Sequence, residues 1–181
     1  MADLSYSALD VAAILSGMEL SCRQESAIID AIWRGECELL SEKYQSDQRK
    51  FILDVRYWIT YFYEKPILDQ EFPVVQKDIS GTNRNLDETQ FLSDFQDLDL
   101  FFKSIRLRIL YGTSHDYVRI KLRTLLSVYD YRRRSAKLME HLHTCLEFYR
   151  LEVFLRGGVP CELDTVDLDQ MVIFRMKEHV Q

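Results

Sequence analysis

The chain has 181 residues, of which 47% are hydrophobic, 12% aromatic and 29% charged, and its formal net charge is −6. This length is enough to bury a core in one or two domains, and the aromatic content excludes an intrinsically disordered chain. With 6 glycines and 3 prolines, the composition also argues against a loop-rich all-β fold.

The location of the protein is predicted from features that its sequence lacks. The N-terminus carries Asp3 and Asp10 and has no basic segment of the kind that opens a signal peptide. No apolar run approaches the ~18 residues that a membrane-spanning helix needs. The cysteines are scattered and form no Cys-x-x-Cys pair, so we expect reduced thiols rather than a disulfide framework. Together these features predict a cytoplasmic protein.

Three helices are predicted in the first third of the chain, over residues 5–17, 22–43 and 46–63. Ser21 and Gln24 have the spacing of a capping box at the start of the second helix. Gly35 weakens the middle of this helix by about 1 kcal/mol relative to alanine, which leaves a break there as the alternative. The third helix carries an apolar stripe that could stack bases but is more typical of a core face. Its β-forming residues leave a strand at its end as the alternative. The stripe consists of Phe51, Val55, Trp58, Ile59 and Phe62.

Residues 64–86 and 87–111 differ in character. Two prolines, a glycine and several Asp, Asn and Ser residues predict a long, mobile connection over 64–86. Residues 87–111 have the clearest helical period, with acidic residues first and basic residues last, as the helix dipole favours, and Gly112 as C-cap. The apolar seam of this helix predicts an internal bundle contact, with pairing to a second chain as the alternative. The seam residues are Phe91, Phe95, Leu98, Phe102, Ile105 and Ile109.

A domain boundary is predicted just after this helix. Residues 1–112 then form an acidic helical region, with 9 Lys and Arg against 19 Asp and Glu over residues 1–102. Residues 113–181 form a second module that holds most of the basic block at 103–139, where 10 Lys and Arg face 2 Asp. A net acidic chain with one basic block is expected to bind a polyanion through that block.

The order of elements in the second module indicates a winged-helix-like fold. Tyr117–Arg123 alternates apolar and basic residues, which predicts a strand with one cationic face. A short helix from Leu122 and a longer one over about 133–149 follow, and two strands at 151–155 and 171–177 form a short β-hairpin. The predicted fold class is therefore mainly α with a minor β part: an N-terminal helical bundle region and a C-terminal winged-helix-like module.

Seven basic residues form the predicted nucleic-acid-binding surface. In a winged helix-turn-helix, residues at the N-terminal end of the second helix reach the bases in the major groove. Arginine side chains bind phosphate or guanine edges, while a salt-bridged protein interface and a solvated face are the alternatives. The acidic segment 162–169 is expected to be a solvated wing, and it counts against standard docking because phosphate would repel it. The seven residues are Arg119, Lys121, Arg123, Arg132, Arg133, Arg134 and Lys137.

No motif for catalysis or for a bound cofactor is present in the sequence. It lacks the Gly-x-Ser-x-Gly nucleophile elbow and the phosphate-binding P-loop. His141 and Cys145 share one helix face, but two ligands need help from elsewhere, such as Cys161 or His179, to bind zinc. We therefore predict a non-enzymatic protein with no catalytic residues, no metal site and no cofactor.

Eight residues of the segment 122–153 fit the pattern R-x-L-L-x-x-(F/Y)-G-x-x-R-R followed by a helix that ends in L-x-x-x-G-L. They are Arg123, Leu125, Leu126, Tyr129, Arg133, Arg134, Leu146 and Leu151. In this pattern the segment resembles a small helical or winged module of bacterial proteins associated with restriction and phage defence. Asp130 stands here at the turn glycine of that module, and Arg150 at the glycine before its last leucine. The resemblance implies an accessory role in nucleic-acid binding and does not extend to residues 1–112.

The predicted function is binding of nucleic acid, with DNA favoured over RNA, in a bacterial defence or DNA-transaction complex. Contact with about six phosphates predicts a log–log salt slope near −5 on duplex DNA. The alternative is a protein–protein assembly subunit. In that case the basic block docks on an acidic partner, and the Phe91–Ile109 seam mediates homo-oligomerisation.

Overall fold

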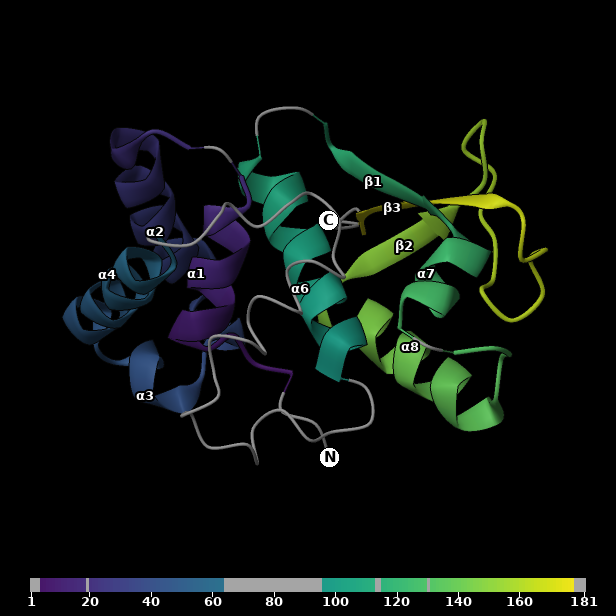
Figure 1. Ribbon diagram of the computed structural model, residues 1–181, viewed down its shortest axis with the longest axis horizontal. Helices are drawn as coiled ribbons and strands as arrows, with labels where there is room; N and C mark the ends of the chain where they lie inside the picture. The colour runs from purple at the N-terminus through teal and green to yellow at the C-terminus, as the bar shows by residue number, and fades with distance from the viewer. Residues whose placement is uncertain (1–3, 19, 64–95, 113–114, 130, 178–181) are drawn as a thin grey trace. The chain divides into compact units, whose positions relative to one another are not determined.

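The computed structural model describes residues 4–18, 20–63, 96–112, 115–129 and 131–177. Over these residues the protein is mainly α-helical with one small antiparallel sheet, which confirms the predicted fold class (Figure 1). The chain divides into two compact units, Met1–Asp94 and Phe95–Gln181. A search of the described helices finds none with the length and apolar character needed to cross a membrane.

Helices build the described part of the N-terminal unit. The predicted capping box is confirmed, because the Ser21 hydroxyl accepts from the Gln24 amide and the Gln24 side chain accepts from the Ser21 amide. A second capping box, between Ser7 and Asp10, starts the first helix. The elements are α1 (Ala8–Ser16), α2 (Cys22–Glu36), the 3-10 turn η1 (Cys37–Leu39), α3 (Glu42–Gln45) and α4 (Gln48–Tyr63).

The helix predicted over 22–43 is interrupted next to Gly35, where a break was the alternative. The chain leaves helical geometry after Glu36 and becomes extended at Leu40. There it forms a parallel bridge with Tyr6: the Tyr6 amide donates to the Leu39 carbonyl at 2.7 Å, and the Ser41 amide donates to the Tyr6 carbonyl at 2.9 Å. Helical geometry would remove these bonds from a fully buried tyrosine. The strand considered for the end of 46–63 is also absent from the described residues, since α4 runs through to Tyr63.

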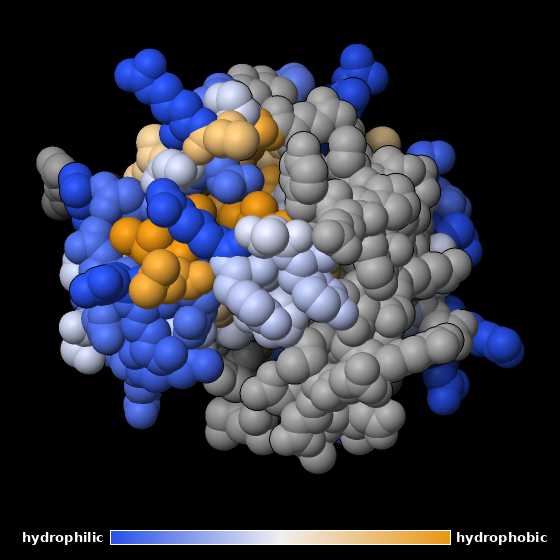
Figure 2. All heavy atoms as spheres, turned by 60° about the vertical axis from the view of Figure 1, so that its left-hand side comes forward, coloured by the Kyte–Doolittle hydropathy of each residue, from blue (hydrophilic) through white to orange (hydrophobic). Residues whose placement is uncertain are grey.

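The core of the N-terminal unit forms where α1 packs against α4. Six of the nine residues of α1 are buried, and three of them are alanines, whose small side chains allow close packing. The stripe predicted on α4 supplies three buried side chains, Phe51, Val55 and Phe62, which confirms it as a core face. The opposite side of α4 exposes Leu53, Tyr57 and Tyr61. Figure 2, with this unit turned forward, shows apolar surface bordered by hydrophilic side chains.

The C-terminal unit consists of one long helix followed by strand, helix, helix, strand and strand. The three strands form an antiparallel sheet in the order β1-β3-β2, which places the last strand between the first two. The element order predicted from residue 117 onward is confirmed. The elements are α6 (Gln96–Tyr111), β1 (Tyr117–Lys121), α7 (Leu122–Val128), α8 (Ala136–Phe148), β2 (Leu151–Phe154) and β3 (Met171–Met176).

The helix α8 begins later than the sequence indicated. The Ser135 hydroxyl accepts from the Leu138 amide at 3.2 Å, so Ser135 is the N-cap and Ala136 is the first helical residue. Arg132, Arg133 and Arg134 therefore lie in the connection before the helix and not in its first turn. This placement moves the three guanidinium groups out of the first turn and so weakens their unfavourable interaction with the N-terminal end of the helix dipole.

Aromatic packing between α6 and the sheet forms the core of the C-terminal unit. The Phe174 ring, from the central strand, lies 5.9 Å from the Phe101 ring and 5.7 Å from the Phe102 ring, both in edge-to-face geometry. All three side chains are fully buried. The Arg106 guanidinium, buried on the same helix, donates to the Tyr149 carbonyl at 2.6 Å and so caps the C-terminal end of α8.

The placement of α6 differs from the predicted domain boundary at residue 112. The unit boundary falls between Asp94 and Phe95, because α6 packs on β1, β3 and α8. Among the seam residues, Leu98, Phe102 and Ile105 are fully buried in this unit, whereas Ile109 is partly exposed. Phe91, Phe95 and the connection predicted over 64–86 lie outside the described residues.

Gly112 ends α6 as predicted. Its amide donates to the Arg108 carbonyl at 2.9 Å, and a Cβ at this position would lie 2.2 Å from that carbonyl oxygen. Only glycine fits such a close approach.

The segment between β2 and β3 first turns tightly and then folds back along β2. Gly157 and Gly158 have φ values of 92° and 81°, in the left-handed region that glycine adopts without strain. The Cys161 amide then donates to the Val153 carbonyl at 3.1 Å, and Pro160 bridges Phe154. The outer edge of β2 is therefore covered by the chain itself.

Candidate nucleic-acid interface

The seven predicted basic residues come from several elements of the C-terminal unit. Two lie on β1, one at the start of α7, and four at or just before the first turn of α8. The contacts of these groups assign them different roles.

Arg119 and Lys121 project from the face of the sheet that points away from the helices. Val118 and Ile120, which alternate with them, pair in register with Phe174 and Val172 of the buried core. Side chains of successive strand residues point to opposite faces, so the two cations lie on the outer face. Both side chains are exposed, which agrees with the predicted cationic strand face.

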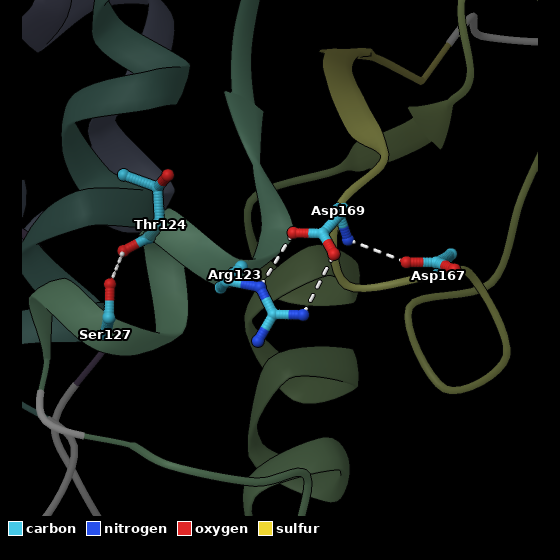
Figure 3. A network of polar contacts seen from close by, with 5 residues as sticks. All are labelled: Arg123, Thr124, Ser127, Asp167 and Asp169. Atoms are coloured by element: carbon cyan, nitrogen blue, oxygen red, sulfur yellow. Dashed lines mark hydrogen bonds and ion pairs between the residues drawn. The ribbon is translucent and has the colours of Figure 1, made fainter.

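Arg123 is held by the acidic segment that precedes β3 (Figure 3). Its guanidinium donates to both carboxylate oxygens of Asp169, at 2.7 and 2.9 Å, and its backbone amide donates to the Leu168 carbonyl at 2.7 Å. Asp167 accepts from the Asp169 amide at 2.8 Å and orients that carboxylate. This bidentate geometry uses the side of the guanidinium that a phosphate would bind.

Arg123→Gln is expected to raise the pKa of the Asp169 carboxyl toward its ordinary value of 3.8. In the wild type the hydrogen bond from Arg123 lowers this pKa. The pair therefore stabilises the folded chain above the ordinary carboxyl pKa, and this contribution is lost as the pH falls through the lowered pKa. An NMR titration of the side-chain carboxyl carbons measures the change. Arg119→Gln is the control and should leave this pKa unchanged; an unaltered titration in Arg123→Gln would contradict the pairing.

The Arg134 side chain anchors the same acidic segment by binding backbone carbonyls of that segment. The guanidinium donates to the carbonyl oxygens of Asp164 and Val166. Two apolar side chains of the same segment, Leu163 and Val166, are buried. The His143 ring, from α8, also hydrogen-bonds the Asp164 carboxylate. The carboxylates of 162–169 are exposed as predicted, but the segment that carries them is fixed to α8 and α7.

Arg132, Arg133 and Lys137 are the remaining cations near α8, and all three are exposed. Arg132 and Arg133 lie in the connection between α7 and α8, and Lys137 lies in the first turn of α8. The exposed side of α8 also carries Glu140 and Glu147, at helical spacing from Lys137. Positive charge on α8 is therefore confined to its N-terminal end.

Sequence reasoning missed a buried polar cluster between α6 and α8. The His141 Nε2 atom lies 2.6 Å from Asp99 Oδ1, and the Cys145 Sγ atom lies 3.6 Å from the same oxygen and 3.5 Å from His141 Nε2. Burial, and then Asp99, raises the pKa of the Cys145 thiol. The spacing of His141 and Cys145 was visible in the sequence. The third group is Asp99, and not Cys161 as considered, because α6 packs on α8; His179 lies outside the described residues.

Comparisons with known proteins find no match for this chain among protein-family models, curated proteins or solved structures.

Proposed function

We propose that the C-terminal unit is a winged-helix-like module that binds DNA through the phosphate backbone and has no enzymatic role. The observation that carries this proposal is its connectivity: α6, β1, α7, α8, β2 and β3 follow one another, with strand order β1-β3-β2. The winged helix-turn-helix has this arrangement, and its second paired helix meets the major groove with its N-terminal end. The accessory role in bacterial defence implied by the sequence resemblance is part of the same proposal.

The charges at the start of α8 support phosphate as the ligand. Arg132, Arg133 and Lys137 are exposed around a helix N-terminus, where the backbone dipole also favours an anion. Arg123 and Arg134 belong to the structural framework, since they hold the segment 162–169. Three phosphate contacts in place of about six reduce the expected salt slope from near −5 to about −3.

The acidic side chains near α8 favour contact with the phosphate backbone of DNA over deep insertion of α8 into the major groove. Glu140 and Glu147 lie on its exposed side, and the segment 162–169 presents further carboxylates. Phosphates repel these groups, so the duplex is expected to meet the N-terminal end of α8 and not its whole length. The proposed interaction is consequently weakly dependent on base sequence.

Arg132→Gln/Arg133→Gln is expected to weaken duplex DNA binding by about tenfold at low salt and to reduce the salt slope by about 2. Fluorescence anisotropy with duplex and single-stranded oligonucleotides, at several salt concentrations, measures both quantities. The matched control is Arg119→Gln/Lys121→Gln, which removes the same charge from the outer face of the sheet and should leave binding unchanged. A larger loss in the control than in the test variant would place the interface on the sheet.

An acidic protein partner is the second candidate for the same cations. The segment 162–169 supports it, because it binds Arg123 through the Asp169 carboxylate. A carboxylate of another chain would meet Arg132 and Arg133 by the same chemistry. Absence of binding to every oligonucleotide at low salt would overturn the DNA proposal in favour of this one.

A further inference from the structure

The buried cluster of Asp99, His141 and Cys145 combines a carboxylate, an imidazole and a thiol. His141 and Cys145 lie one turn apart on α8, and Asp99 meets them from α6. The three ligand atoms lie within 4.8 Å of one another. Borderline-soft divalent cations such as Zn²⁺ take this combination of N, S and O ligands, whereas Mg²⁺ and Ca²⁺ prefer oxygen alone.

The distances in the cluster approach those of a tetrahedral zinc site. Zinc bonds of about 2.3 Å to sulfur and about 2.0–2.2 Å to nitrogen and oxygen give edges of about 3.5–3.6 Å from sulfur to either neighbour. The Cys145 Sγ atom lies 3.5 Å from His141 Nε2 and 3.6 Å from Asp99 Oδ1. The nitrogen–oxygen edge, at 2.6 Å, has hydrogen-bond length and opens to about 3.3 Å in a tetrahedral site.

We propose that Asp99, His141 and Cys145 bind one Zn²⁺ ion between α6 and α8. Binding breaks the Cys145 S–H bond, releases that proton to solvent and forms a zinc–thiolate bond. The neutral His141 ring exchanges its Nε2 proton for one on Nδ1 through solvent, so that Nε2 and the Asp99 carboxylate donate lone pairs to the ion. Three protein ligands leave a fourth position for water. The His141 side chain is 13% exposed and the Asp99 side chain 6%, so His141 forms the more accessible rim of the site.

The charges around the cluster have opposite effects on the affinity of the site for the metal ion. The Asp99 carboxylate and the Cys145 thiolate together balance the two charges of the ion. Burial and the Asp99 carboxylate raise the pKa of the thiol, Lys103 on α6 opposes this only in part, and its buried ammonium repels a dication. The site is therefore expected to be weaker than a structural zinc finger, whose four ligands include several thiolates and no adjacent cation.

Cobalt titration of the metal-free full-length protein tests the proposal directly. One equivalent of Co²⁺ is expected to produce a thiolate-to-cobalt charge-transfer band together with the visible absorption of tetrahedral cobalt, and Zn²⁺ should displace both. Cys145→Ser should abolish the charge-transfer band, and His141→Gln should lower the affinity by more than about tenfold. Zinc should also raise the melting temperature of the C-terminal unit in the wild type, because it links two helices of that unit.

Matched controls separate this site from other thiols and imidazoles. Cys161→Ser removes a thiol outside the cluster, and His143→Gln removes the ring that bonds Asp164, which lies in a second group of potential ligands. Both variants should retain the full cobalt spectrum. A wild-type protein without the charge-transfer band overturns the proposal, whether or not the variants fold. Retention of the band in Cys145→Ser, or its loss in Cys161→Ser, also overturns it.

Discussion

Phe174→Ala is expected to lower the free energy of unfolding of the C-terminal unit by about 3–5 kcal/mol, the usual cost of truncating a buried phenylalanine. The side chain is fully buried on the central strand, in edge-to-face contact with Phe101 and Phe102. Its removal leaves a cavity between the sheet and α6 that neighbouring rings cannot fill without leaving their rotamers. A unit of this size has a total stability of the same order, so partial unfolding at room temperature is the expected outcome.

The two tryptophans make this prediction specific to one unit. Trp33 and Trp58 both lie in the N-terminal unit, so tryptophan fluorescence follows that unit, while far-UV circular dichroism follows both. During urea unfolding, Phe174→Ala should shift the dichroism transition and leave the fluorescence transition in place. Phe51→Ala, which truncates a buried ring on α4, should shift the fluorescence transition together with the part of the dichroism transition that comes from the N-terminal unit. A shift of the fluorescence transition in Phe174→Ala would show that the two units unfold together.

Arg134→Gln is expected to lower the stability of the C-terminal unit by about 2–3 kcal/mol. The guanidinium donates two charge-assisted hydrogen bonds to the carbonyls of Asp164 and Val166, and glutamine cannot reach both. The loss falls first on the segment before β3, so limited proteolysis should cut there before the rest of the unit opens. Dichroism-monitored urea unfolding gives the stability change, and mass spectrometry locates the cut.

Arg133→Gln is the matched control for Arg134→Gln, since it removes the same charge from the neighbouring, exposed position. Its expected effect on stability is within about 0.5 kcal/mol. The two substitutions therefore separate the framework role of Arg134 from the proposed phosphate contact of Arg133. An Arg134→Gln protein with wild-type stability and proteolysis would contradict the anchoring role.

Local periodicity made most of the C-terminal unit predictable. The alternation around Val118 and Ile120 marks a half-buried strand, and the change of period at Leu122 marks the start of α7, because burial on one face sets both patterns. The same local rules predicted the capping box at Ser21. The boundary between the two units differs from the one predicted at residue 112. The helical pattern of α6 is local, but the unit to which α6 belongs depends on its packing against strands that come later in the chain.

Other features of the structure depend on residues that are distant in the sequence. The end of α2 depends on the pairing of Leu40 with Tyr6, which no helical pattern contains. Charge counting treated Arg123 and Arg134 like their neighbours, although Asp169 and the carbonyls of 162–169 bind them. Asp99 joined no sequence motif, because its partners lie more than 40 residues away on α8. A sequence read alone gives the types of these side chains and not their neighbours.

The fold-back of the chain along β2 also bears on self-association. In the order β1-β3-β2, the outer strands would each offer unpaired backbone groups to a strand of another molecule. The return through Pro160 and Cys161 occupies that edge of β2, and proline lacks the amide that would extend the pairing. Arg119 and Lys121 place like charges on β1, which repel an identical strand brought alongside. The sheet is thus guarded on both sides against the edge-to-edge addition that begins fibril formation.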